Sequence, residues 1–174
     1  MPLSLHAAFV PTCLQILGST KAIVEKAKVF CEEAGLAQEQ LIFARLAEDM
    51  LPFNYQVKST VVHSVSAIKS LERGVFLPDT NRPPETFELL SSMLDKAVED
   101  LTKLTEDDLE KYIGKEMCFE FKEFKVPFTA ENFLLSFSQP NFFFHATTAY
   151  DILRENGLKI GKIDFMGAMR KAQN

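Results

Sequence analysis

The sequence predicts an all-α protein, a four-helix bundle with a long connection between its second and third helices. Apolar residues recur every seven positions in the first third of the chain and again after residue 86, which is the spacing of a buried helical face. Between these regions, residues 75–84 contain three prolines, which is typical of a loop. Antiparallel helices joined by short loops and one crossover form many such bundles.

The first predicted helix runs from Ser4 to Gly35. Ser4 suits the N-cap position, and Gly35 can end the helix in a left-handed conformation. Pro11 either kinks this helix or marks its true first turn. The repeating apolar residues are Phe9, Ile16, Ile23 and Phe30, and Val10, Leu17, Val24 and Cys31.

The middle of the chain predicts two further helices. A helical region through residues 41–45 extends to a break at Leu51 and Pro52, and it continues from Phe53 to Gly74. The third helix begins at Thr86, and a short helical piece follows over residues 105–114. The loop at residues 75–84 is the long crossover that separates the second helix from the third.

A small β-hairpin is predicted before the last helix. Residues 117–121 and 124–128 alternate in polarity, as two paired strands do. Thr129 caps the last helix, which we expect to be interrupted at Pro140 and to end near Gly157. The tail, residues 159–174, should lie over the surface.

Composition predicts one cytoplasmic domain spanning residues 1–174, with 47% hydrophobic and 25% charged residues. A net charge of −5 with dispersed basic residues argues against nucleic acid as a partner. No apolar run is long enough to predict a membrane span, and the first residues lack the features of a signal peptide. Three cysteines without a Cys-x-x-Cys pair favour reduced, buried thiols.

The last helix carries a line of polar residues through an apolar surface. Asn141, His145 and Thr148 are spaced i, i+4 and i+7, so they share one helical face. An unpaired buried donor or acceptor costs roughly 1–3 kcal/mol, so these side chains need partners. These partners could be other side chains, water or a metal.

Phenylalanine is concentrated near this line, with nine of the sixteen between Phe119 and Phe144. Three interpretations are open. The hairpin could pack its aromatic residues over one end of the bundle, the aromatic residues could form a ligand pocket, or those left exposed could form the face of a homodimer.

Five segments, in this order along the chain, resemble those of the DinB/YfiT-like superfamily of four-helix bundles, and of a domain-of-unknown-function family within it. They are residues 4–11 (SLHAAFVP), 44–52 (ARLAEDMLP), 140–150 (PNFFFHATTAY), 153–157 (LRENG) and 161–165 (GKIDF). The resemblance spans nearly the whole chain.

The resemblance implies a site for a divalent metal, often nickel or zinc, held by three histidines. In that superfamily one histidine lies on the second helix and two lie four residues apart on the last. Several related enzymes use the metal to activate a low-molecular-weight thiol. By resemblance, the last-helix pair falls at Asn141 and His145, and the second-helix position falls near Gln56, with His63 two turns further along the same face.

This chain departs from that pattern, because only His145 of the matched positions is a histidine. Amide oxygens are poor ligands for zinc and nickel. We therefore expect a hydrogen-bonded cluster of Gln56, Asn141 and His145. One alternative is a rebuilt metal site that uses His63, Asp49 or Glu48. Another is a metal-free small-molecule pocket over the same residues, with Thr148 beside it.

Two functional hypotheses follow. In the first, the protein is a homodimeric bundle that binds a small ligand or has a structural role. In the second, it is a nickel- or zinc-dependent transferase or isomerase of a thiol cofactor, with His145 as the surviving ligand. The missing histidines favour the first, and the sequence assigns no catalytic residue.

Overall fold

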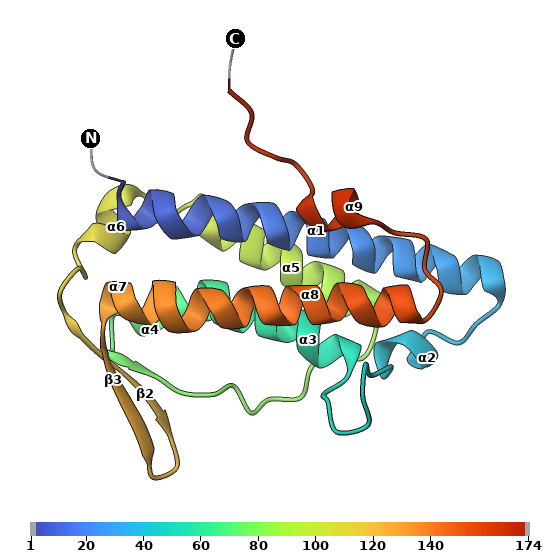
Figure 1. Ribbon diagram of the computed structural model, residues 1–174, viewed down its shortest axis with the longest axis horizontal. Coiled ribbons are helices and arrows are strands. Elements are labelled where there is room, and N and C mark those ends of the chain that lie inside the picture. The colour runs from blue at the N-terminus through green and yellow to red at the C-terminus, as the bar shows by residue number, and fades with distance from the viewer. Residues whose placement is uncertain (1–2, 173–174) are drawn as a thin grey trace.

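The computed structural model describes residues 3–172 and shows four long helical segments lying side by side (Figure 1). The first helix packs against α5 and α8, and α3 packs against the same two helices. The prediction of a mostly helical protein is confirmed. The segments are α1 (Leu5–Ala34); α3 (Phe53–Val61) with the π-helical η1 (Val62–Ser66) and α4 (Ala67–Ser70); α5 (Phe87–Thr102); and α7 (Ala130–Asn132) with the π-helical η2 (Phe133–Ser138) and α8 (Gln139–Glu155).

Helix α1 begins and ends as the sequence predicts. The Ser4 hydroxyl accepts a hydrogen bond from the backbone N–H of Ala7, and Gly35 closes the helix with φ 64°. Pro11 lies inside the helix rather than in its first turn. By length and composition α1 could cross a membrane, but half of its apolar window is buried in the protein, as in the core helix of a bundle.

The region before α3 is the first correction to the predicted fold. Helix α2 (Glu39–Ile42) is only one turn long, and residues 43–52 are turns and irregular chain. The guanidinium of Arg45 donates to the carbonyl of Met50 across this loop. Pro52 has extended backbone and precedes α3, and a proline disfavours helical geometry in the residue before it.

The predicted hairpin is confirmed, but the protein is not all-α. Strands β2 (Glu116–Phe121) and β3 (Phe124–Thr129) are antiparallel, and β1 (Val75–Phe76) pairs with β2 in parallel. Residues 75–76 were predicted to be loop, and their pairing is long-range, so a local pattern does not reveal it. A Cβ on Gly74 would lie 3.3 Å from the carbonyl oxygen of Glu116, which fits a close approach of these two strands.

The last helical segment starts after Thr129, as predicted, but it is not interrupted at Pro140. The π-helical η2 directly precedes α8, so Pro140 lies inside one continuous helical segment rather than at its start. Two short helices complete the fold: α6 (Glu106–Glu110), and α9 (Lys162–Met166), where only surface chain was predicted. Helix α9 packs on α1, and Gln15 donates a 2.8 Å hydrogen bond to the carbonyl of Met166.

Candidate ligand-binding pocket

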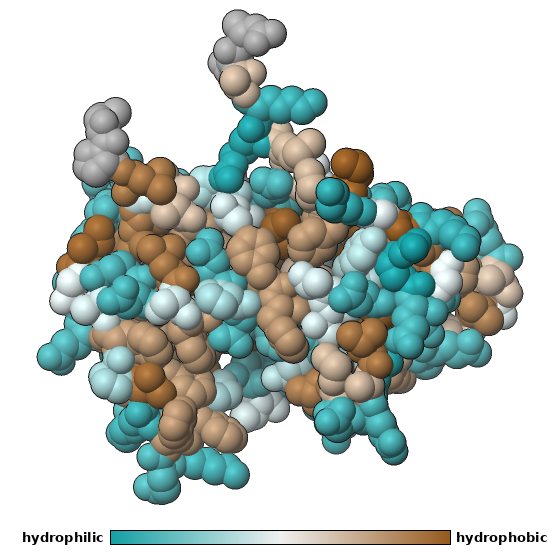
Figure 2. Space-filling view, viewed as in Figure 1, coloured by the Kyte–Doolittle hydropathy of each residue, from teal (hydrophilic) through white to brown (hydrophobic). Residues whose placement is uncertain are grey.

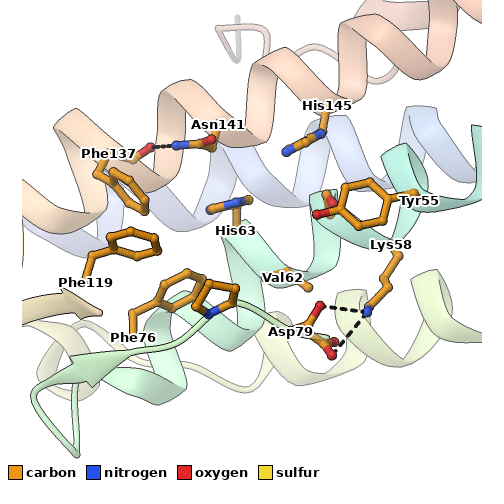
Figure 3. A pocket seen from close by; sticks show the side chains of 12 residues that line it. Tyr55, Lys58, Val62, His63, Phe76, Asp79, Phe119, Phe137, Asn141 and His145 are labelled. Atoms are coloured by element: carbon orange, nitrogen blue, oxygen red, sulfur yellow. Dashed lines mark hydrogen bonds and ion pairs between the residues drawn. The ribbon is translucent and has the colours of Figure 1, made fainter. Parts of the chain in front are cut away.

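A cavity of about 210 Å³ lies between the second and last helical segments and the start of the crossover. Helix α3 and η1 supply one wall, η2 and α8 supply a second, and residues 76–79 supply a third (Figure 3). Both π-helical segments of the protein described here contribute lining residues, His63 from η1 and Phe137 from η2. Such segments are frequent at functional sites because they re-aim side chains within a helix.

One hydrogen bond fixes the orientation of the His145 ring. Its Nδ1 lies 2.7 Å from Oε1 of Gln56, which is buried on α3. The amide nitrogen of Gln56 donates to the carbonyl of Leu51 at 2.8 Å, so the oxygen faces the ring. Nδ1 of His145 therefore carries the proton and donates, and its Nε2 carries the lone pair.

The His63 ring is fixed in a similar way by Ser138. Nδ1 of His63 lies 3.3 Å from the hydroxyl oxygen, and that hydroxyl donates to the backbone carbonyl of His63 at 3.3 Å. Because the hydroxyl proton is used in this way, Nδ1–H of His63 is the donor to Ser138. The rings of His63 and His145 lie nearly parallel, with centroids 5.6 Å apart and an interplanar angle of 14°.

Burial keeps both histidines uncharged. It lowers the pKa of His63 to about 3, with a further contribution from repulsion by His145. Burial also lowers the pKa of His145 to about 4. At neutral pH the pocket therefore contains two neutral imidazoles whose Nε2 atoms can accept a hydrogen bond.

An ion pair between the buried Lys58 and the partly exposed Asp79 closes the side of the pocket formed by the crossover. The Lys58 ammonium lies 3.1 Å from the Asp79 carboxylate, and it also donates to the carbonyls of Asp79 and Asn81. Burial raises the pKa of Asp79, but the backbone N–H of Asn81 and the Lys58 ammonium outweigh it and hold the pKa below its usual range. The pair adds no net charge and fastens the crossover to α3.

Aromatic side chains form the remaining wall. The ring centroids of Phe119 and Phe137 are 4.9 Å apart, and Phe76 lies 6.3 Å from both. His63 lies 5.6 Å from Phe76 and 5.9 Å from Phe137. Across the cavity, Tyr55 contacts His145 edge-on at 6.1 Å, and its hydroxyl points into the cavity (Figure 3).

The structure gathers four of the five residues predicted to bind a ligand. His63, Asn141 and His145 line this cavity, and Gln56 lies behind His145 without lining it. Asn141 donates to the carbonyl of Phe137 at 2.7 Å, so the expected three-way cluster is reduced to the pair Gln56–His145. Thr148 is buried one turn further on, where its hydroxyl donates to a backbone carbonyl and does not line the cavity.

The sequence did not reveal several of the lining residues, among them Lys58, Phe76 and Asp79. Lys58 is a lone basic residue on a helix, and Asp79 and Phe76 lie in a segment predicted to be loop. Only the folding of the crossover over α3 brings them together. A lysine at a helical position that is otherwise buried was the one local signal available.

Comparison with known proteins shows the family of this chain. Residues 5–166 match a family described as a domain of unknown function, DUF1993. The chain belongs to the DUF1993 family. A comparison with curated proteins gives no match. The crystal structure of a DinB family member protein from Shewanella denitrificans is similar to this DUF1993 chain, with 25% identity and a TM-score of 0.81 over 98% of this chain and 96% of that chain. The resemblance to DinB-like proteins in the sequence is confirmed.

The residues of this DUF1993 pocket do not fit a three-histidine metal centre. The available donors are two neutral imidazoles and the amide of Asn141, because the Asp79 carboxylate that also lines the cavity is paired with Lys58. Within residues 3–172 no three side chains of the metal-binding types (His, Cys, Asp, Glu) form a group that could hold a metal. Glu48 and Asp49, weighed above as replacements, are exposed in the loop before α3. Zinc and nickel centres use imidazole, thiolate or carboxylate ligands, so one ligand is missing.

Proposed function

We propose that this DUF1993 protein is a cytoplasmic, DinB-type four-helix bundle that binds a small molecule in the pocket between α3 and α8. One observation carries the proposal. His63 and His145 both line the cavity, and each has its Nδ1 bonded to a neighbouring side chain, which leaves both Nε2 atoms available.

In a purely structural cluster we would expect these nitrogens to be paired within the protein. Among the hydrogen bonds of residues 3–172, the ring nitrogens of His63 and His145 appear only through Nδ1. Over residues 3–172 the one buried side-chain nitrogen or oxygen without a partner is Thr129 Oγ1, so the two Nε2 atoms are accessible from the cavity and free to accept a hydrogen bond from a molecule inside it.

Histidine NMR signals test the proposal with an internal control. In a screen of small aromatic and amide-containing compounds, binding in the pocket should shift the ring signals of His63 and His145. The chain has only one other histidine, His6, which lies at the start of α1 against the carbonyl of Leu104. Its signal should not move. No shift at His63 or His145 with any compound would reject the pocket as a binding site.

A second candidate function is a metal-dependent thiol-cofactor transferase or isomerase. It is favoured by the way both histidines donate from Nδ1 to a fixed oxygen, because metal-bound histidines are usually held in this manner. Its weakness is the missing third ligand described above.

Elemental analysis of untagged protein separates the two functions. The second function predicts stoichiometric metal, or a thermal shift with nickel, zinc or manganese that His145→Ala removes and His6→Ala retains. The first predicts neither. It predicts instead that His145→Ala costs roughly 1–3 kcal/mol of unfolding free energy, because the buried Gln56 oxygen loses its donor.

We also propose that the protein is a homodimer through the hairpin. The Phe121 side chain is 46% exposed and Phe124 is 62% exposed, and Figure 2 shows hydrophobic surface over the hairpin. Light scattering after size exclusion should give twice the monomer mass. The double variant Phe121→Ser, Phe124→Ser should give the monomer mass. Leu89→Ser, at an exposed residue away from the hairpin, should still give the dimer mass.

A further inference from the structure

The chemistry of the cavity wall narrows the class of ligand, and this step rests on the proposed function. We propose that the ligand is an uncharged aromatic molecule that donates a hydrogen bond from an O–H or N–H group to His63 or His145. A phenol is the simplest member of this class.

The requirement for a donor comes from the hydrogen bonds behind the two rings. The amide nitrogen of Gln56 is committed to Leu51, and the Ser138 hydroxyl proton is committed to the backbone of His63. Both side chains therefore present an oxygen lone pair to Nδ1, which places the ring proton there. The face that each histidine turns to the cavity is an acceptor, and an acceptor selects a donor.

The requirement for neutrality comes from the charges around the cavity. Lys58 and Asp79 are the charged residues that line it, and they are paired with each other at 3.1 Å. The Lys58 side chain is only 6% exposed and already has two backbone carbonyl partners. An ionic ligand would enter without a free countercharge, and a buried, unpaired charge is costly.

The requirement for an aromatic body comes from the opposite wall. Phe76, Phe119 and Phe137 form a continuous ring cluster, and His63 contacts two of its members. Aromatic pairs of this kind gain energy from tilted and edge-on contacts with a further ring. A flat ring between this wall and Tyr55 would contact aromatic groups on both sides (Figure 3).

Phenol and toluene test the inference, because they have nearly the same shape and differ in one hydroxyl. Dissociation constants would be measured on the full chain by titration of the His63 and His145 signals, with benzoate and benzylammonium as charged analogues. We expect phenol to bind about fivefold more tightly than toluene or better, which is the value of one net hydrogen bond. The two ions should bind more weakly than phenol.

Each result decides a separate point. Equal binding of phenol and toluene, or tighter binding of either ion, would overturn the donor or the neutrality requirement and leave the pocket as a binding site. If none of the four compounds moves the signals of His63 and His145, the inference fails for this ligand class, and the wider screen described above then decides on the pocket itself.

A variant of Gln56 tests whether the tautomer of His145 causes the preference for phenol over toluene. Gln56→Glu keeps the side-chain size but places a carboxylate behind His145, which favours the imidazolium and turns Nε2 into a donor. The preference for phenol over toluene should fall, and benzoate should bind more tightly than it does to the unaltered protein. Gln40→Glu, at an exposed glutamine, adds the same charge and should change neither. An unchanged preference in correctly folded Gln56→Glu would overturn the role assigned to Gln56.

Discussion

The contact of α1 with α5 and the contact of α3 with α8 are both extensive, but they are built from different residues. On α1 and α5 the buried side chains are mostly apolar, and the buried Ser19 and Thr20 bond to a carbonyl of their own helix. On α3 the buried side chains include Asn54, Gln56 and Lys58, whose partners lie on other segments.

The difference shows that the polar part of the bundle core lies between α3 and α8. Polar side chains at core depth must reach partners, and here those partners lie on α8, on the crossover and on the loop before α3. The same region holds the pocket and both π-helical segments described above. Local departures from ordinary packing rules are expected at functional sites, so the α3–α8 side is where function is to be sought.

Among single substitutions, the largest expected effect lies at the apolar contact. Leu94 on α5 is fully buried, and Leu94→Ala should lower the unfolding free energy by about 3 kcal/mol, because it removes apolar contacts and leaves a cavity. Chemical denaturation measures this change. Leu89→Ala on the same helix is the control, because Leu89 is 57% exposed and its loss should stay within about 0.5 kcal/mol. Similar losses for both would contradict the assignment of α5 to a tightly packed contact.

A smaller effect is expected where the crossover is fastened to α3. Lys58→Met removes the buried ammonium and leaves the Asp79 carboxylate and two carbonyls without it. We expect a loss of about 1–3 kcal/mol and faster hydrogen exchange in residues 77–85.

The matched control for this lysine is Lys69→Met. Its ion pair with Asp100 is on the surface, with the Lys69 side chain 65% exposed, so the loss should be below about 1 kcal/mol. If the crossover exchanged no faster in Lys58→Met than in Lys69→Met, Lys58 would not be what holds it.

Mild acid should also lower the stability of the protein, through the two histidines on the α3–α8 side. The usual histidine pKa is about 6.5, whereas burial lowers it to about 3 for His63 and about 4 for His145. As the pH falls below 6.5, these two histidines bind protons in the unfolded chain but not in the folded protein, so the free energy of unfolding should decrease. The loss continues until the pH passes the folded-state values.

Denaturation curves between pH 7 and pH 5 check this sign. The double variant His63→Gln, His145→Gln should lose less stability across that range than the unaltered protein does, whatever its stability at pH 7. His6→Gln should follow the unaltered protein. Parallel curves for all three would show that the two pocket histidines are not held neutral in the fold.

Local patterns in the sequence predicted the helices that bury one continuous apolar face. The seven-residue series of α1, apart from the half-buried Phe30, and the one containing Leu94 and Leu101 in α5 lie in the core. Ser4 and Gly35 cap α1 as expected, and α5 begins after Thr86. The wrong predictions lie where the local structure depends on contacts with other segments. Residues 75–76 become a strand only through β2, and the helix around Pro140 continues because η2 precedes it.

For the candidate site, helical spacing was sufficient to place Asn141 and His145 on one face and His63 along the face of Gln56. It could not show that Asn141 bonds its own helix, or that Ser138 is the partner of His63, because a hydrogen bond depends on atoms a few ångströms apart. The wall formed by Lys58, Asp79 and Phe76 required the path of the crossover.

The sequence by itself determined the helical class of this protein, the ends of its main helices and the family to which it belongs. These depend on patterns within one segment or on motifs in a fixed order. The tertiary structure alone decided the third strand, the pocket, the pairing of Lys58 with Asp79 and the neutral state of the two histidines. Each of these needs groups from separate segments to meet, and the burial that lowers a histidine pKa exists only once the helices and the crossover have packed around it.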